Sequence, residues 1–356
     1  MTIDVQELPP ERRKEKVTDP DKLGFGRIFT DHMLLVEWKA QEGWVNPRIK
    51  PYEPFLLDPA ALVFHYAQEI FEGLKAYRWS DGTIALFRPE MNARRFNASA
   101  ERMCMPTVPE KLFLQGIETL VRLEADWIPT APGTSLYIRP TMIAVEPVLG
   151  VKPSDHYYFY VILSPVGAYY ASGFNPVRIM VEDRYVRAVP GGTGEAKTGG
   201  NYASSLKAGL EAKKKGFDQV LWLDGRHRKY IEEVGAMNMF FAYGNRIVTA
   251  PLEGSILHGV TRDSVIELAA RLGYQVEERR IDVDALMDDI RTGKVTEAFG
   301  SGTAAVITPV GSLGYRGETV PIGEGGVGPI TQTLYDTLTA IQTGKVPDTF
   351  GWVRKI

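Results

Sequence analysis

The sequence of 356 residues contains very little cysteine and histidine. Its single cysteine, Cys104, excludes an intrachain disulfide and any metal site built from several thiolates. The five histidines are scattered, with none of the H-x-x-x-H or H-E-x-x-H spacings that are typical of zinc enzymes. We therefore expect no metal site.

Long hydrophobic runs and an excess of one charge are also absent. The longest apolar stretches, such as residues 157–163, fall far short of the roughly 20 residues that span a bilayer. Since 41 basic side chains face 44 acidic ones, the net charge of −3 gives no reason to expect a nucleic acid or an anionic membrane as partner. Residues 1–20 are polar and lack the apolar core of a signal peptide. We expect a cytoplasmic protein.

The length suits two domains better than one compact core. A segment rich in small residues, Gly and Pro at 166–176 is the predicted interdomain loop. It separates a small N-terminal α+β domain, 1–165, from a larger C-terminal domain, 177–356. Apolar runs predict strands at 32–38, 83–87, 135–139, 157–164, 177–181, 219–223, 238–243 and 246–249. Helical patterns cover 91–104, 111–127, 201–215, 260–272, 283–291 and 330–343.

One glycine pattern, Gly323–Gly328, matches the G-x-G-x-x-G of dinucleotide sites. No strong strand precedes it, and Pro329 begins the helix that follows. Too few residues remain after it for a complete nucleotide-binding half. We therefore interpret these glycines as a connecting loop.

A second glycine-rich segment, residues 191–202, reads G-G-T-G-E-A-K-T-G-G-N-Y and places Lys197 between glycines. Glycines let the backbone approach another group closely. A lysine in such a place can act as a nucleophile or as a general base. Taken alone, the segment would more simply be a mobile surface loop with an exposed lysine, because short motifs often match by chance.

The surrounding sequence favours the chemical interpretation, because it resembles the branched-chain amino-acid aminotransferases, fold-type IV enzymes that use pyridoxal phosphate. The matching blocks are FGRIFTDHM (25–33), HYAQEIFEGLK (65–75), SLYIRP (135–140), GGTGEAKTGGNYASSL (191–206), YIEEVGAMN (230–238), LEGSILHGVTR (252–262) and EAFGSGTA (297–304). The resemblance implies a two-domain α+β fold like that of D-amino-acid aminotransferase, with the cofactor in the interdomain cleft. It also implies a homodimer in which the small domain of one subunit partly covers the other's site.

The resemblance also assigns residues to the cofactor. Lys197 would be the catalytic residue that bonds to pyridoxal 5'-phosphate and moves the proton. Glu233 would lie beside the pyridine nitrogen, Tyr202 beside the ring hydroxyl and Arg95 beside the phosphate. Further phosphate donors would be Val260, Thr261 and Thr303.

Two sequence neighbours serve as internal comparisons. Arg94 would point about 100° away from Arg95 around a helix. Glu232 would point to the face of a strand opposite to Glu233, as a solvated or structural acid.

The substrate-binding residues are also implied by the resemblance. The pocket must accept both an aliphatic and an acidic side chain, which an apolar wall with one polar group at its rim allows. Arg139 would reach the second carboxylate of glutamate. The other residues would be Phe25, Tyr66 and Tyr137 along the side chain and the N–H groups of Thr303 and Ala304 at the α-carboxylate, with Phe71 and Tyr169 as weaker candidates.

The expected activity is reversible ping-pong transfer of an amino group between leucine, isoleucine or valine and 2-oxoglutarate. On the same fold, a D-amino-acid transaminase or an aminodeoxychorismate lyase would share the lysine and the carboxylate. A non-catalytic small-molecule binding protein is the alternative from another class. Tyr66, Tyr137 and Arg139 favour the branched-chain enzyme.

The sequence departs from the mammalian members of the family in one place. Their redox-active C-x-x-C is replaced here by Ala305–Thr308, so we expect no thiol–disulfide regulation at this turn. Ala236 also stands where that subgroup commonly has threonine.

Overall fold

The computed structural model describes residues 2–17, 19–167 and 174–356. The chain forms two compact units, of which unit 1 comprises Met1–Tyr169, Ala196–Gly199 and Ala340–Ile356, and unit 2 comprises Tyr170–Glu195 and Gly200–Thr339. This division differs from the predicted domains, because the segment that carries Lys197 and the C-terminal 17 residues both group with the N-terminal unit. The predicted loop at 166–176, including Tyr169, lies largely outside the described residues.

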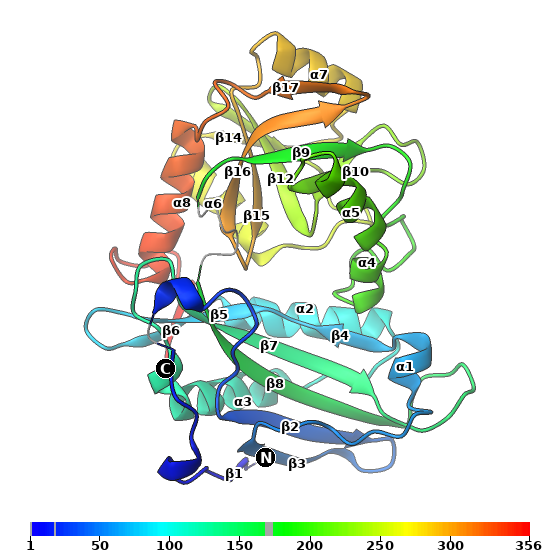
Figure 1. Ribbon diagram of the computed structural model, residues 1–356, viewed down its shortest axis with the longest axis vertical. Helices are drawn as coiled ribbons and strands as arrows, with labels where there is room; N and C mark the ends of the chain where they lie inside the picture. Colours follow the sequence, from blue (N-terminus) through cyan, green and yellow to red (C-terminus); the bar gives the residue numbers. More distant parts are fainter. Residues whose placement is uncertain (1, 18, 168–173) are drawn as a thin grey trace. The chain divides into compact units, whose positions relative to one another are not determined.

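Unit 1 contains a nine-stranded, mostly antiparallel sheet of order β1-β3-β2-β8-β7-β5-β6-β18, with β4 paired to β7 (Figure 1). The C-terminal strand β18 completes the edge beside β6. The strands are β1 (Asp4–Val5), β2 (His32–Lys39), β3 (Gly43–Pro51), β4 (Glu69–Phe71), β5 (Leu74–Arg78), β6 (Ile84–Phe87), β7 (Ser135–Ala144), β8 (His156–Val166) and β18 (Val353–Lys355).

The core of unit 1 lies between one face of this sheet and two helices, α2 (Pro89–Arg102) and α3 (Glu110–Leu123). Phe96 of α2 and Phe113 of α3 pack on Phe159 of β8, with ring centroids 5.5 and 5.8 Å apart. The remaining helical segments are the short α1 (Leu62–Tyr66) and the 3-10 turns Pro10–Arg12, Pro20–Lys22 and Ala125–Trp127.

The other face of the same sheet carries polar and aromatic side chains. In β7, Leu136 and Ile138 are buried in the core, so Tyr137 and Arg139 between and beside them point to the opposite face. Strand β4 pairs with β7 so that Phe71 lies opposite Thr141. Strand alternation therefore collects predicted substrate residues on one face of unit 1.

Unit 2 is built around a barrel. Its strand order is β11-β10-β9-β16-β15-β12-β13-β14, and because β11 also pairs with β12, six strands close into a ring. The strands are β9 (Val177–Glu182), β10 (Gln219–Leu223), β11 (Ile231–Val234), β12 (Met237–Tyr243), β13 (Arg246–Thr249), β14 (Gln275–Glu278), β15 (Glu297–Gly302), β16 (Val306–Tyr315) and β17 (Glu318–Pro321).

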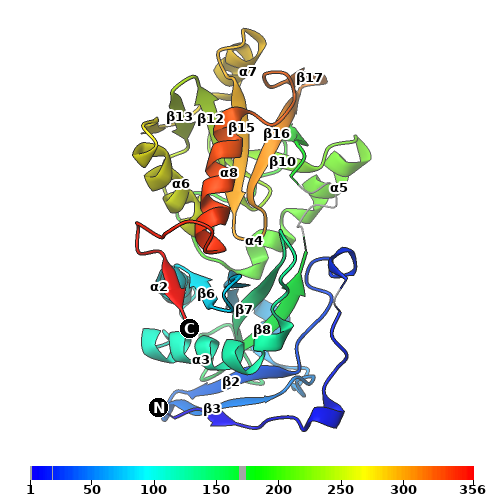
Figure 2. The same ribbon diagram turned by 90° about the vertical axis from the view of Figure 1, so that its left-hand side faces the viewer.

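The helices of this part of the chain surround the barrel strands (Figure 2). They are α4 (Gly199–Ala203), α5 (Leu206–Lys214), α6 (Val260–Arg271), α7 (Val283–Arg291) and α8 (Pro329–Gln342). The single helix predicted at 201–215 is in fact two, α4 and α5. Ser204 and Ser205 donate their hydroxyls to the carbonyls of Asn201 and Tyr202, which competes with helical bonding at this point.

The interpretation of the first glycine pattern, Gly323–Gly328, as a connecting loop agrees with its surroundings. The strand before it, β17, is antiparallel to β16, whereas a dinucleotide site needs a parallel β–α unit. The carboxylate of Glu297 accepts the N–H groups of Ile330 and Thr331 at 3.0 and 2.8 Å. The protein's own carboxylate therefore occupies the helix end that a pyrophosphate would need.

No helix within the described ranges has the length and hydrophobicity needed to cross a membrane.

Candidate active site

The segment that carries Lys197 is fixed by backbone contacts within unit 1. The Lys197 N–H donates to Ser99 Oγ of α2, and the Lys197 carbonyl accepts the N–H of Phe71 of β4, both at 2.9 Å. The Thr198 hydroxyl donates to the carbonyl of Glu69 at 2.7 Å. The lysine Nζ lies 4.9 Å from the centroid of the Phe71 ring. Lys197 and Thr198 thus lie alongside β4 and are held there by hydrogen bonds.

Arg95, the predicted phosphate ligand, makes a bidentate ion pair in this structure. Its Nε and Nη2 lie 2.7 and 2.9 Å from the two oxygens of Glu72, a carboxylate that is fully buried. Burial raises the pKa of Glu72, but Arg95, Lys197 and Asn92 together outweigh it, and the pKa ends below its ordinary value. Glu72 therefore stays ionised and orients the guanidinium of Arg95.

The adjacent arginine behaves as expected for a residue on the outer side of α2. The side chain of Arg94 is 68% exposed and pairs at 3.6 Å with Glu110, whereas that of Arg95 is 10% exposed. Of the two arginines, only Arg95 is held by a buried partner.

Three of the predicted substrate residues form one aromatic cluster in unit 1. The rings of Phe25 and Tyr137 meet edge to face at 4.9 Å. The guanidinium of Arg139 lies 4.7 Å from the Phe71 ring and 5.2 Å from the Tyr137 ring, and its Nη2 donates to the Tyr137 hydroxyl at 3.0 Å. The cluster thus also includes Phe71, one of the two weaker candidates.

Tyr66 lies apart from these contacts. Its side chain, at the end of α1, is 40% exposed, and its hydroxyl donates to the carbonyl of Leu149. Its assignment to the substrate pocket remains a prediction.

In unit 2, a single hairpin organises several of the predicted cofactor residues. Strands β11 and β12 pair so that Glu233 lies opposite Asn238, and Asn238 lies opposite Ser301 of β15. The Asn238 amide donates to the carbonyl of Leu257 at 3.1 Å, just before α6 begins at Val260. A Cβ at Gly259 would lie 2.0 Å from the Asn238 amide oxygen, so only glycine fits there. The hairpin therefore positions a carboxylate and a helix N-terminus together.

Glu233 is almost completely buried and has an arginine as partner. Its Oε2 lies 2.5 Å from Nη1 of Arg187, and both side chains are at most 5% exposed. Sequence analysis did not identify Arg187, which lies ten positions before Lys197 in the stretch Arg184–Arg187. A buried carboxylate requires a counter-charge. The need for a counter-charge therefore predicts a basic partner for Glu233, but it does not say whether Arg184 or Arg187 supplies the charge.

The neighbouring acid, Glu232, is also buried, which corrects the expectation of a solvated side chain. It contacts a different group from Glu233, since the hydroxyl of Ser255 donates to its Oε1 at 2.5 Å. Burial raises the pKa of Glu232 to about 7. The expectation of a structural acid agrees with these contacts.

We expect Glu232→Gln to stabilise the protein above pH 7. There the folded protein holds an ionised buried carboxylate, a cost that disappears as the pH falls from 7 towards 4.5, because the folded state takes up the proton first. The variant should raise the free energy of unfolding by about 2 kcal/mol at pH 8 and by almost nothing at pH 4. Urea unfolding at the two pH values measures the difference, with the exposed Glu267→Gln as control. An equal effect at both pH values would contradict the assignment.

The first turn of α6 has the features of an anion-binding site. Its N-cap is Gly259, so no side chain at the cap accepts the N–H groups of the first turn, to which the predicted phosphate donors Val260 and Thr261 belong. The helix is 12 residues long and both donors are buried.

The turn that contains Thr303 and Ala304 connects β15 to β16. Gly302 pairs with Val306, so only three residues form the turn, and Val306 has a φ of +63°, which is rare for a β-branched residue. Strain of this kind occurs at ligand-binding loops. Both predicted residues are half-buried, as is Tyr202 on α4.

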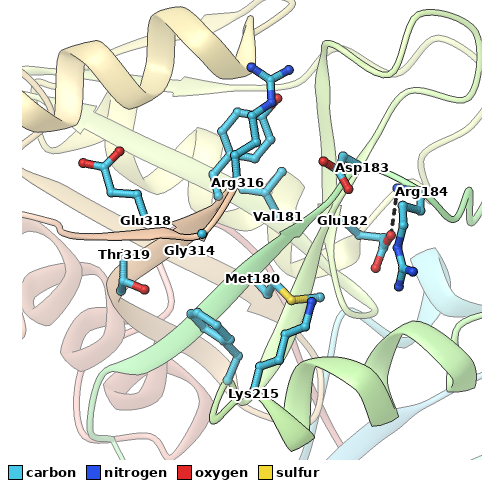
Figure 3. Close-up of a pocket in the computed structure, with 13 residues that line it drawn as sticks. Met180, Val181, Glu182, Asp183, Arg184, Lys215, Gly314, Arg316, Glu318 and Thr319 are labelled. Atoms are coloured by element: carbon cyan, nitrogen blue, oxygen red, sulfur yellow. Dashed lines mark hydrogen bonds between the residues drawn. The ribbon is translucent and has the colours of Figure 1, made fainter.

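The described part of the chain contains no group of three or more potential metal-ligating side chains. A hollow of about 280 Å³ within unit 2 is lined by none of the predicted residues (Figure 3). Its walls come from β9, β16 and β17 and mix charges of both signs, with Arg184, Lys215 and Arg316 beside Glu182, Asp183 and Glu318. It has no feature that selects a ligand.

Comparisons with known proteins agree on one family. The sequence pattern of amino-transferase class IV matches residues 69–313. Branched-chain-amino-acid aminotransferase 2 of Bacillus subtilis is 55% identical over 343 residues, which cover 96% of this chain and 94% of that protein. The structure of the Escherichia coli branched-chain amino acid aminotransferase has a TM-score of 0.73 at 28% identity, covering 91% of this chain and 98% of that one. The branched-chain amino acid aminotransferase of T.th., complexed with N-(5'-phosphopyridoxyl)-L-glutamate, has a TM-score of 0.72 at 30% identity, with 90% and 97% covered.

Proposed function

Because the chain belongs to the class IV aminotransferase family, we propose that it is a branched-chain amino-acid aminotransferase. It transfers the amino group of L-leucine, L-isoleucine or L-valine reversibly to 2-oxoglutarate, with pyridoxal 5'-phosphate as cofactor. The observation that carries the proposal is the 55% identity to an enzyme of that name over almost the whole chain.

The chemistry of the residues fits this cofactor. Pyridoxal phosphate supplies an aldehyde that bonds to an amine and a ring that withdraws electrons from the substrate. The chain offers an amine whose backbone is held by hydrogen bonds, Lys197, and a buried carboxylate paired with Arg187, Glu233. For the phosphate it offers Arg95 and the N-terminus of α6, with Thr303 as a further donor.

Each of these residues would have a distinct role in the proposed reaction. Lys197 Nζ would take the proton from the substrate α-carbon and later return it. Glu233 would keep the ring nitrogen of the bound cofactor protonated, and the phenol of Tyr202 would donate to the ring oxygen. Val260 and Thr261 would supply backbone donors to the phosphate.

Substrate recognition follows the aromatic cluster of unit 1. Phe25 and Tyr137 of this cluster, and Tyr66 outside it, would provide apolar surface for the aliphatic side chain, and Arg139 would provide the charge for the second carboxylate of glutamate. Thr303 and Ala304 would bind the α-carboxylate. The relative from T.th., whose complex contains a glutamate adduct of the cofactor, supports the acidic substrate.

A panel of amino donors with 2-oxoglutarate tests the proposed function. L-leucine, L-isoleucine and L-valine should be turned over efficiently and D-alanine should not. Efficient turnover of D-alanine would favour a D-amino-acid transaminase. If no amino donor is turned over, the result would favour the alternative of a non-catalytic small-molecule binding protein.

We also propose that the protein is a homodimer. Several apolar side chains of unit 1 are exposed in the single chain, namely Leu56 (99%), Phe64 (61%), Leu149 (63%) and Val151 (83%). Exposed apolar groups of this kind mark association surfaces.

We expect Val151→Asp to weaken dimerisation about 100-fold, because it places a charge within a surface that association dehydrates. Light scattering after size-exclusion chromatography should show a change from about twice to once the chain mass of 39.6 kDa. Leu272→Asp, at a position 42% exposed in unit 2, is the control. An unchanged mass for Val151→Asp would contradict this surface assignment.

A further inference from the structure

Arg139 has unused hydrogen-bonding capacity in a confined place. Its guanidinium contacts the rings of Phe71 and Tyr137, and Nη2 donates to the Tyr137 hydroxyl. Its Nε is buried and has no hydrogen-bond partner among the described residues. Arg139 as a whole is half-buried, and a cation with such a buried, unpaired N–H group is stabilised by a nearby negative charge.

Glu69 is the carboxylate that meets this requirement within unit 1. Residues 69 and 71 of β4 share a face, and their pairing with Ile143 and Thr141 of β7 places them on the Arg139 side of the sheet. Burial raises the pKa of Glu69, and the Gly199 N–H and the charge of Arg139 oppose that rise. The charges of Glu69 and Arg139 also act on the pKa of Tyr160 of β8, which Glu69 raises and Arg139 lowers.

Glu69 is also in direct contact with the lysine segment. Its Oε1 accepts the Gly199 N–H, two residues after Lys197, and its carbonyl accepts the Thr198 hydroxyl. A Cβ at Gly199 would lie 2.1 Å from the Glu69 carboxylate, so a larger residue there would displace this acid. The two hydrogen bonds hold Glu69 beside the lysine segment.

We propose that Glu69 determines the balance between aliphatic and acidic substrates. The inference rests on the proposed function. When an aliphatic side chain occupies the pocket, Glu69 balances the charge of Arg139. When glutamate or 2-oxoglutarate binds, its second carboxylate competes with Glu69 for Arg139. Glu69 therefore favours the binding of branched-chain substrates and weakens the binding of dicarboxylates.

The physical reason is that one cation must serve two ligands of different charge. Without Glu69, an aliphatic side chain would lie beside an uncompensated guanidinium, which costs desolvation. With Glu69, an incoming carboxylate meets a like charge nearby, which lowers its affinity. A specificity residue of this type acts on the difference between the two affinities.

The experiment compares two unreactive acids on the cofactor-loaded protein by calorimetry: glutarate, a dicarboxylate, and 4-methylpentanoate, an aliphatic monocarboxylate. In Glu69→Gln, which keeps an acceptor for Gly199, glutarate should bind about fivefold more tightly, the factor that corresponds to about 1 kcal/mol. The affinity for 4-methylpentanoate should fall or stay within twofold. Because both acids are measured on the same sample, a loss of folded protein cancels in the ratio of their affinities.

Two further variants sharpen the test. Glu69→Asp keeps the charge and should return the ratio towards that of the unmodified protein. Glu118→Gln removes another buried acid of unit 1, paired with Arg354, and should leave the ratio unchanged. If Glu69→Gln has the same ratio of glutarate to 4-methylpentanoate affinity as the unmodified protein, and that protein transaminates leucine, the inference about Glu69 is wrong and the proposed function still holds. If the unmodified holoprotein binds neither acid and transaminates no donor, the proposed function fails instead.

Discussion

Lys197→Ala is expected to abolish multiple-turnover transamination, with a loss of at least about 10⁴-fold in kcat, because the variant lacks the amine that we propose bonds to the cofactor and moves the proton. The fold should survive, since the contacts that fix this segment to Ser99 and Phe71 use the lysine's backbone N–H and carbonyl. Steady-state assays with L-leucine and 2-oxoglutarate measure the loss.

Two controls make the result specific to this lysine. Lys207→Ala changes an exposed lysine of α5 and should leave kcat unchanged. Peptide mass analysis after borohydride treatment should locate the cofactor on Lys197 in the unmodified protein. Turnover within tenfold of normal in Lys197→Ala, or the cofactor on another lysine, would refute the assignment.

Glu233→Gln is expected to keep the cofactor but to lower kcat by about 10²- to 10³-fold. A neutral amide no longer favours the protonated ring nitrogen, so the ring becomes a weaker electron sink. The change also leaves the buried Arg187 facing an uncharged group, so a modest loss of stability should accompany it.

The adjacent Glu232→Gln is a matched control for this effect. It removes the same charge from the next residue of β11, where the side chain contacts Ser255 and not Arg187. Its kcat should remain within about twofold of normal, as is usual for a residue outside the reacting groups. Equal losses in the two variants would show that Glu233 acts through the stability of the hairpin and not on the ring.

Much of the fold could be predicted from periodicity. The strands at 219–223 and 246–249 and the helix at 283–291 agree with the structure to the residue. Strand β16 was missed because Pro309, Gly311 and Gly314 interrupt its sequence, and such residues ordinarily indicate turns. Glycine is tolerated at position 314 because the Phe217 ring fills the place of its side chain. Such compensation depends on tertiary contacts.

The predictions drawn from the resemblance also divide into those that local sequence supports and those that depend on tertiary contacts. The class IV family and the two-domain, fold-type IV architecture are confirmed by the matching relatives and solved structures. Local geometry separates Arg95 from Arg94 and Glu233 from Glu232, because helix and strand periods set which way each side chain turns. The partners Glu72 and Arg187 could not be predicted, since each lies distant in sequence from the residue that it pairs with.

The division of the chain has a consequence for how this architecture can change. The path passes from unit 1 to unit 2 and back twice, because Ala196–Gly199 and Ala340–Ile356 both belong to the first unit. A cut near residue 170 would remove β18 from its place beside β6 and would separate Lys197 from its supports on α2 and β4. Neither unit is therefore a module that recombination could exchange as one continuous piece.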